Sequence, residues 1–64
     1  MFNVDNCTKL YGNEFLTVYA DNDTDMYYTV DFEGELVDRD TSLQKIERMY
    51  RVFSVIAFSQ KALA

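Results

Sequence analysis

The hydrophobic pattern of this 64-residue chain changes its period once, close to residue 41. Upstream, residues 14–20 and 26–32 are rich in β-branched and aromatic side chains, which is typical of strands. Downstream, hydrophobic residues recur at intervals of three and four, as on one face of a helix (Leu43, Ile46, Tyr50, Phe53, Ala57). This order predicts a single α+β domain over residues 1–64: a small antiparallel meander of three or four strands, then one long C-terminal helix packed on one face.

Polar and glycine-containing segments mark the turns of the predicted sheet. Asp21–Asp25 is a run of five polar residues that favours a hairpin loop, and Gly34 is expected to supply a positive φ in a second turn. The predicted strands are residues 14–20, 26–32, 35–38 and, if Gly12–Asn13 forms a turn, 7–11. The first five residues are expected to form either an additional strand or a mobile end.

The register of the central hairpin is predicted from its aliphatic residues. Pairing Leu16 with Val30, Val18 with Tyr28 and Ala20 with Met26 gathers the aliphatic side chains on one face. Three aromatic rings then share the opposite face (Phe15, Tyr19, Tyr27). They are expected either to pack among themselves or under the N-terminal segment, or to form a contact surface for a partner protein.

The helix is predicted to span residues 42–63, with Thr41 and Gln44 forming a capping box at its start. At 1.5 Å per residue it is about 30 Å long, more than the width of a four-stranded sheet, so part of it should overhang. The overhang includes the apolar segment 52–58, for which a kink or a strand is an alternative. We expect an oligomer interface there, formed by Val52, Val55 and Phe58, and hence a homodimer.

Charge narrows the classes of partner. Eleven acids against six bases give a net charge of −5. Residues 1–40 hold ten acids and two bases, a net of −8, whereas residues 41–64 hold one acid and four bases, a net of +3. A negative chain is repelled by phosphate backbones, so direct nucleic-acid binding is not expected.

The acids of the predicted sheet have two interpretations. They either keep a small sheet soluble and protect its edges, or they dock on a positively charged protein surface. Carboxylates alternating along a strand repeat at roughly 6.6–6.8 Å, which approximates phosphate spacing and suggests a DNA mimic. The predicted acidic docking face comprises Asp21, Asp23, Asp25, Asp31, Glu33 and Glu35.

No residue pattern indicates catalysis, a cofactor or a metal. The single cysteine, Cys7, has no histidine to activate it, because the chain contains none. Asp21, Asp23 and Asp25 are spaced like the first calcium ligands of an EF-hand, but Met26 and Phe32 stand where that loop requires glycine and glutamate. We therefore expect a non-enzymatic protein with no catalytic residues and no metal.

The unpaired cysteine fits a reducing compartment, and neither a signal peptide nor a transmembrane segment is evident. We expect a cytoplasmic protein, in the host cytoplasm if the chain is viral, without membrane contact.

In size, acidity and plainness the chain resembles the small host-takeover proteins of bacteriophages, a resemblance of type that rests on no motif. It implies an inhibitor or modulator that binds a host protein, for example at the nucleic-acid channel of a polymerase, a nuclease or a CRISPR effector. The alternative is a homodimeric structural or regulatory subunit assembled through the apolar C-terminal helix.

Overall fold

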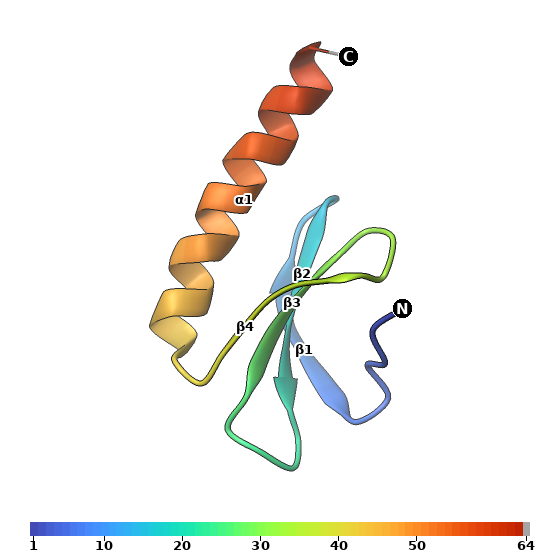
Figure 1. Ribbon diagram of the computed structural model, residues 1–64, viewed down its shortest axis with the longest axis vertical. Helices are drawn as coiled ribbons and strands as arrows, with labels where there is room; N and C mark the ends of the chain where they lie inside the picture. Colours follow the sequence, from blue (N-terminus) through green and yellow to red (C-terminus); the bar gives the residue numbers. More distant parts are fainter. Residues whose placement is uncertain (64) are drawn as a thin grey trace.

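A four-stranded antiparallel sheet and one C-terminal helix make up the fold (Figure 1). The computed structural model describes residues 1–63. The sheet is a meander with the strand order β1-β2-β3-β4, and the helix α1 follows the last strand. The elements are β1 (Cys7–Gly12), β2 (Leu16–Asp21), β3 (Tyr27–Asp31), β4 (Leu36–Asp40) and α1 (Leu43–Leu63). The predicted α+β fold is thus confirmed, the strand at 7–11 exists, and residues 52–58 are helical.

The register of the central hairpin differs from the prediction by one residue. Ala20 pairs with Tyr27 rather than with Met26, and Val18 pairs with Thr29 rather than with Tyr28. Since successive side chains of a strand point to opposite faces, this shift turns every side chain of β3 to the other face relative to β2. Val18 and Thr29 consequently share one face of the sheet.

The core lies between this face and α1. Leu16, Val18, Thr29 and the helical Ile46 are all buried, the last three completely. Tyr11 of β1, which pairs with Val18, contacts Tyr50 of the helix, and this identifies the shared face as the helix side. The buried Thr29 hydroxyl has no hydrogen-bond partner among the described residues.

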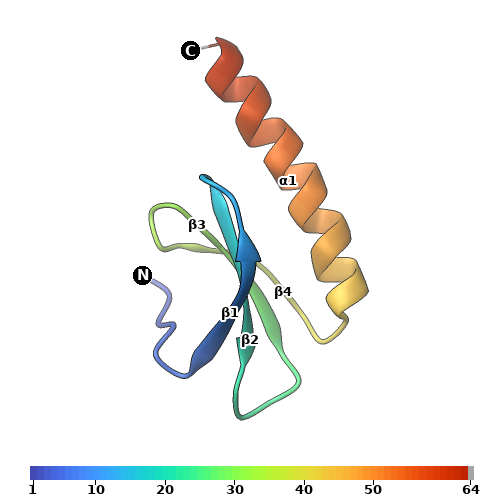
Figure 2. The ribbon, with the colours of Figure 1, turned by 180° about the vertical axis from the view of Figure 1, so that it is seen from behind.

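The N-terminal segment covers the opposite face of the sheet (Figure 2). It forms no strand, but the Phe2 N–H donates to the Gly34 carbonyl at 2.7 Å and the Phe2 ring lies 4.6 Å from that of Tyr28. Val30 points to this second face and is only 4% exposed. Gly34 has the predicted positive φ, at 83°. Both faces of the sheet are therefore partly covered.

The helix begins one residue later than predicted, with Ser42 as its N-cap. The Ser42 hydroxyl accepts from the Lys45 N–H at 3.3 Å, and the Ser42 carbonyl accepts the first helical hydrogen bond, from Ile46. The predicted capping box of Thr41 and Gln44 is therefore wrong. The Asp40 carboxylate accepts from the Ser42 N–H and so positions the cap.

The C-terminal half of α1 projects beyond the sheet, as predicted (Figure 1). The molecule is accordingly elongated, with principal extents of 40 × 23 × 15 Å. The overhanging half leaves side chains exposed that a longer sheet would cover.

Candidate functional site

The six acids of the predicted docking face lie at two opposite ends of the sheet. Asp21 ends β2, and Asp23 and Asp25 lie in the β2–β3 connection, whereas the other three end β3 or lie in the β3–β4 connection (Asp31, Glu33, Glu35). These connections lie at opposite ends of β3, a five-residue strand that spans about 17 Å. The acids do not alternate along one strand, so the phosphate-like spacing does not describe them.

The β2–β3 loop is built by its own carboxylates. Asp21 Oδ1 accepts from the Asp23 N–H at 2.8 Å, and Asp21 Oδ2 accepts from the Tyr28 hydroxyl at 3.3 Å. The Asp23 N–H, together with the Tyr28 hydroxyl, holds the pKa of the Asp21 carboxyl below its ordinary value. Asp23 also accepts from the side chain of Asn6. Asp23 and Asp25 are exposed, and neither carboxylate takes part in an ion pair among residues 1–63.

The acids at the opposite end have partners within the chain. Asp31 Oδ1 accepts from the N–H groups of Glu33 and Glu35, both at 2.9 Å, and thereby shapes the β3–β4 turn. Glu35 lies 3.8 Å from the N-terminal amino group. Only Glu33 of this group is free of such contacts in the described part of the chain. The β2–β3 loop thus presents two exposed carboxylates without an ion pair among residues 1–63, whereas the opposite end presents one, that of Glu33.

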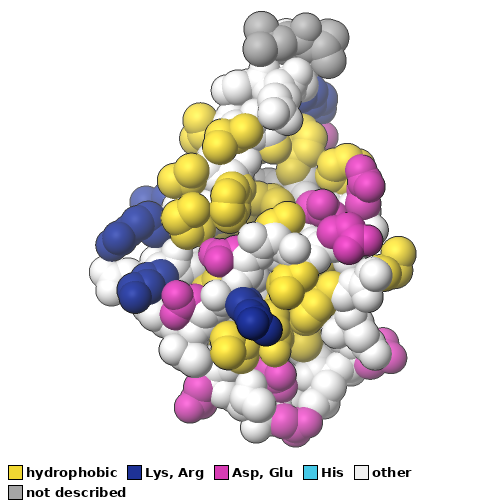
Figure 3. Space-filling view, viewed as in Figure 1, with side chains coloured by type: hydrophobic (Ala, Val, Ile, Leu, Met, Phe, Trp, Pro, Cys, Tyr) yellow, Lys and Arg dark blue, Asp and Glu magenta, His cyan; other side chains and the backbone are white. Residues whose placement is uncertain are grey.

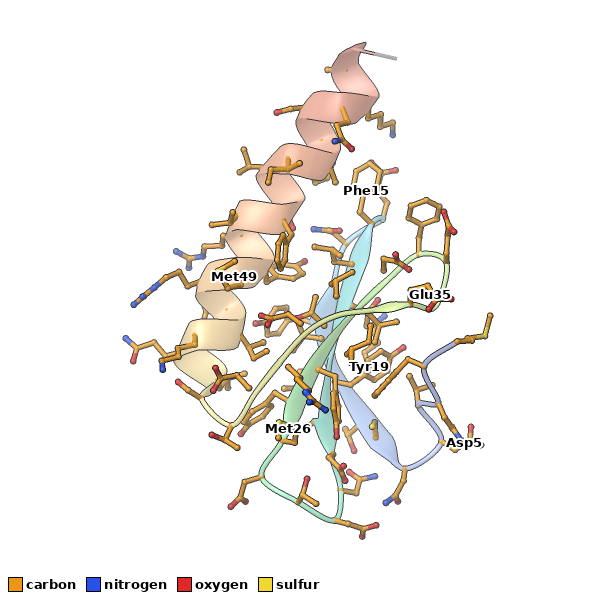
Figure 4. All side chains as sticks on the ribbon, viewed as in Figure 1. Asp5, Phe15, Tyr19, Met26, Glu35 and Met49 are labelled. Carbon is orange, nitrogen blue, oxygen red and sulfur yellow. The ribbon has the colours of Figure 1, made fainter. Side chains whose placement is uncertain are left out.

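The predicted aromatic face does not form. Phe15 lies 4.8 Å from Phe58 of the helix, ring to ring, and 6.4 Å from Phe32. Tyr27 lies on the helix face, because it is two residues from Thr29. Tyr19 pairs with Tyr28 on the other face, and Figure 4 shows it on the side of the sheet away from α1. The one-residue shift in register separates Tyr19 from Tyr27.

A set of contacts that sequence reasoning missed joins the tip of the β1–β2 hairpin to one flank of the helix. Four residues on successive turns of the helix contact residues 11–15, in the pairs Tyr11–Tyr50, Asn13–Ser54, Phe15–Phe58 and Glu14–Lys61. The Asn13 side chain donates to Ser54 Oγ at 2.9 Å, and Lys61 Nζ lies 3.0 Å from both carboxylate oxygens of Glu14. The opposite charges of Glu14 and Lys61 are the only hint of this docking in the sequence.

These contacts divide the residues of the predicted oligomer interface. Val52 and Val55 are 44% and 66% exposed, as the prediction requires. Phe58 points instead to the hairpin tip, where its ring packs against Phe15, and it is 45% exposed. Ile56, which was not part of the predicted set, is 49% exposed beside Val52. Figure 3 shows hydrophobic side chains gathered along the viewer-facing side of α1, with Lys and Arg bordering its lower half.

The structure gathers no metal-binding cluster from the described residues. No group of three or more potential metal ligands occurs among them. Burial, followed by the charge of Asp21, raises the pKa of the Cys7 thiol, which favours the unreactive protonated form. A depression of about 320 Å³ is lined by four residues from α1 alone (Gln44, Glu47, Arg48, Arg51).

Within residues 1–63, no helix has the length and apolar character needed to cross a membrane. Comparison of the chain with protein-family models, with curated proteins and with solved structures finds no match.

Proposed function

We propose that this chain is a non-enzymatic protein-binding module that docks on a positively charged surface of another protein through its β2–β3 loop. The observation that carries the proposal is the pair of exposed carboxylates, Asp23 and Asp25, in a loop braced by the Asp23–Asp21 hydrogen bond; neither forms an ion pair with a described residue. The Asp21 carboxylate is instead occupied within the chain, where it accepts from the Asp23 N–H and the Tyr28 hydroxyl. Preorganised charge of this kind accelerates association with a surface of the opposite sign.

A nucleic-acid-binding surface of a host protein is the basic surface that the proposal favours. The net charge of −5 opposes direct contact with phosphates but favours contact with the residues that bind them. Because Asp23 and Asp25 lie in one loop rather than alternating along a strand, the proposal requires local charge complementarity and not imitation of a DNA backbone.

The first experiment captures the partner from a lysate of the source cells with three forms of the chain. The loop variant carries Asp23→Asn and Asp25→Asn, which remove charge but keep hydrogen-bond acceptors. The matched control carries Glu33→Gln and Glu35→Gln at the opposite end of the sheet. We expect wild type and the control to retain the same basic protein and the loop variant to lose it.

The second experiment measures the association rate with the captured protein as ionic strength rises. Exposed charges are screened over about 8 Å at physiological salt. The association rate should therefore fall steeply when the salt concentration is raised about tenfold, from about 0.05 M to about 0.5 M. Equal rates at both concentrations, or equal capture by the loop variant, would contradict the proposal.

The alternative, a homodimeric structural or regulatory subunit, is favoured by a different observation, the exposed apolar flank of α1.

A further inference from the structure

The two flanks of α1 are covered unequally. On one flank, the β1–β2 hairpin tip contacts Tyr50, Ser54, Phe58 and Lys61. The other flank is turned away from the hairpin, because its residues lie on the opposite side of the helical wheel. It exposes Val52 and Ile56 by 44% and 49%. Apolar side chains that follow one another along a helix without cover mark a contact surface.

The sequence intervals between the residues of this exposed flank indicate that a second helix can pack on it. Its residues follow intervals of four, three, four and three (Lys45, Met49, Val52, Ile56, Ser59). This is the spacing of a coiled-coil seam, in which each side chain packs between those of a second helix. Met49 is half-buried and links the seam to the core, whereas Ser59 and Lys45 are exposed at its ends. We name these five residues the α1 seam.

The sheet edges are poor alternatives as contact surfaces. Both outer strand pairs contain a register shift, at Lys9–Tyr11 in β1 and at Thr29–Val30 opposite β4. β4 also carries the charged run Asp38, Arg39, Asp40 along an open edge. Bulges and charges of this kind oppose the addition of a further strand. The α1 seam carries no bulge and no charge between Met49 and Ile56 on its own positions.

We propose that the α1 seam binds the α1 seam of a second copy of this chain, with the two helices antiparallel. A two-fold axis near residue 54 then places Val52 of one copy against Ile56 of the other, and Met49 against the small Ser59. Every apolar residue of the seam meets a complementary position without any change in the rest of the fold.

Charge selects the antiparallel arrangement. Lys45, Arg48 and Arg51 lie in the first half of the helix, and residues 52–60 carry no charge. In a parallel pair these bases would face their own copies. In the antiparallel pair the two Arg48 side chains lie about 18 Å apart along the axis, at 1.5 Å per residue. The two Arg51 side chains lie about 9 Å apart by the same measure, so both separations exceed the screening length of about 8 Å, and both arginines lie beside uncharged residues of the other copy, near 60 and 57.

The size of the seam sets the strength of the dimer. From Lys45 to Ser59 it is about 21 Å long and roughly 10 Å wide, far below the ~800 Å² that each partner buries in a stable complex. We therefore expect a reversible dimer that dissociates between about 10 µM and 1 mM. The inference does not depend on the proposed role of the β2–β3 loop, since the two surfaces share no residue.

Sedimentation equilibrium over this concentration range tests the proposal. The mass should rise from the 7.5 kDa of one chain toward twice that value. Ile56→Glu should weaken the dimer about tenfold or more, because it places two unpaired carboxylates in the seam. The matched control, Gln44→Glu, adds the same charge at an exposed helical position outside the seam and should leave dimerisation unchanged. A chain that stays monomeric at 1 mM overturns the proposal and leaves the seam to a different protein.

Disulfide trapping tests the orientation of the helices. In a Cys7→Ser background, the double variant Met49→Cys/Ser59→Cys should form a covalent dimer on mild oxidation. Each single variant should remain uncrosslinked, since two copies of residue 49 lie about 15 Å apart along the axis. Efficient crosslinking by Met49→Cys alone would show a parallel pair and contradict the antiparallel arrangement.

Discussion

The contact between Phe58 and Phe15 separates the observed fold from the sequence-based expectation that Phe58 faces a second subunit. In the structure the two rings meet edge to face at 4.8 Å, and Phe58 is 45% exposed. Replacing Phe58 by alanine should therefore destabilise the monomer itself. The expected loss has two parts, the apolar area that Phe58 buries and the specific interaction of the two rings.

The magnitude follows from the exposed fraction. Complete burial of a phenylalanine stabilises by up to about 3 kcal/mol, so burial of roughly half contributes about 1.5 kcal/mol. The edge-to-face pair adds about 0.5–1.5 kcal/mol to the loss in free energy of unfolding, whereas the better helix propensity of alanine reduces the loss by about 0.5 kcal/mol. The net loss is about 2 kcal/mol, a large share of the roughly 3–10 kcal/mol expected for a domain of 64 residues.

Urea denaturation followed by circular dichroism, at a few micromolar protein so that the monomer dominates, measures this loss. With a slope of about 1 kcal/mol per molar urea, the midpoint should fall by roughly 2 M. Val55→Ala is the matched control, because Val55 is 66% exposed and should change the free energy of unfolding by less than about 0.5 kcal/mol. A double-mutant cycle with Phe15→Ala should give a coupling of about 0.5–1.5 kcal/mol.

The reasoning is refuted if Phe58→Ala unfolds at the same urea concentration as wild type and the cycle shows no coupling. If that variant also failed to dimerise, Phe58 would belong to the oligomer interface, as its position in the sequence suggests.

Three further substitutions test other parts of the fold. Thr29→Val removes a buried hydroxyl that has no partner among the described residues, and should raise the free energy of unfolding by about 1 kcal/mol in the same urea assay; a loss would reveal a bound water or another partner. Ser42→Ala should cost about 1 kcal/mol and Thr41→Ala much less, since Ser42 caps α1; the reverse order in thermal melts would restore the capping box. The lowered pKa of Asp21 contributes stability that is present above its ordinary pKa of about 4 and is lost as pH falls through the lower pKa of the folded state. The free energy of unfolding should therefore fall more for wild type than for Asp21→Ala between about pH 5 and 2. Parallel plots of this free energy against pH would contradict the role of Asp21.

The order of the elements could be predicted from the sequence because it depends on local signals. The change of period near residue 41 marks the boundary between sheet and helix, and the predicted helix end agrees with α1. Gly34 has the positive φ expected of it. These features need only a few neighbouring residues, so tertiary contacts do not override them.

The register of the central hairpin was not predictable by the same means. The prediction placed all aliphatic residues on one face, which assumes that only one face is buried. In the structure, Thr29 is buried against the helix side, while Val30 is buried on the face where Phe2 lies. Because the N-terminal segment covers the second face, an aliphatic residue such as Val30 can be buried there, and placing all aliphatic residues on one face is no longer favoured. The loop then sets the register, through the hydrogen bonds of Asp21.

The candidate site was predicted only in part, because its geometry depends on distant pairs. The acids of the β2–β3 loop were recognised as a group, but the sequence did not separate them from those near Asp31. The position of Phe58 depends on Phe15, 43 residues earlier in the chain. No local pattern reports which flank of a helix such a residue will cover.

The wide sequence separation of the hairpin–helix contacts also orders the folding of the chain. Each hairpin of the meander closes a short loop, whereas the bonds Asn13–Ser54 and Glu14–Lys61 join residues 41 and 47 positions apart. Long loops close last, since their ends meet only after the intervening chain is ordered. The last turns of α1 should thus dock late and detach first, and their amide protons should exchange with solvent well before those of β2 and β3.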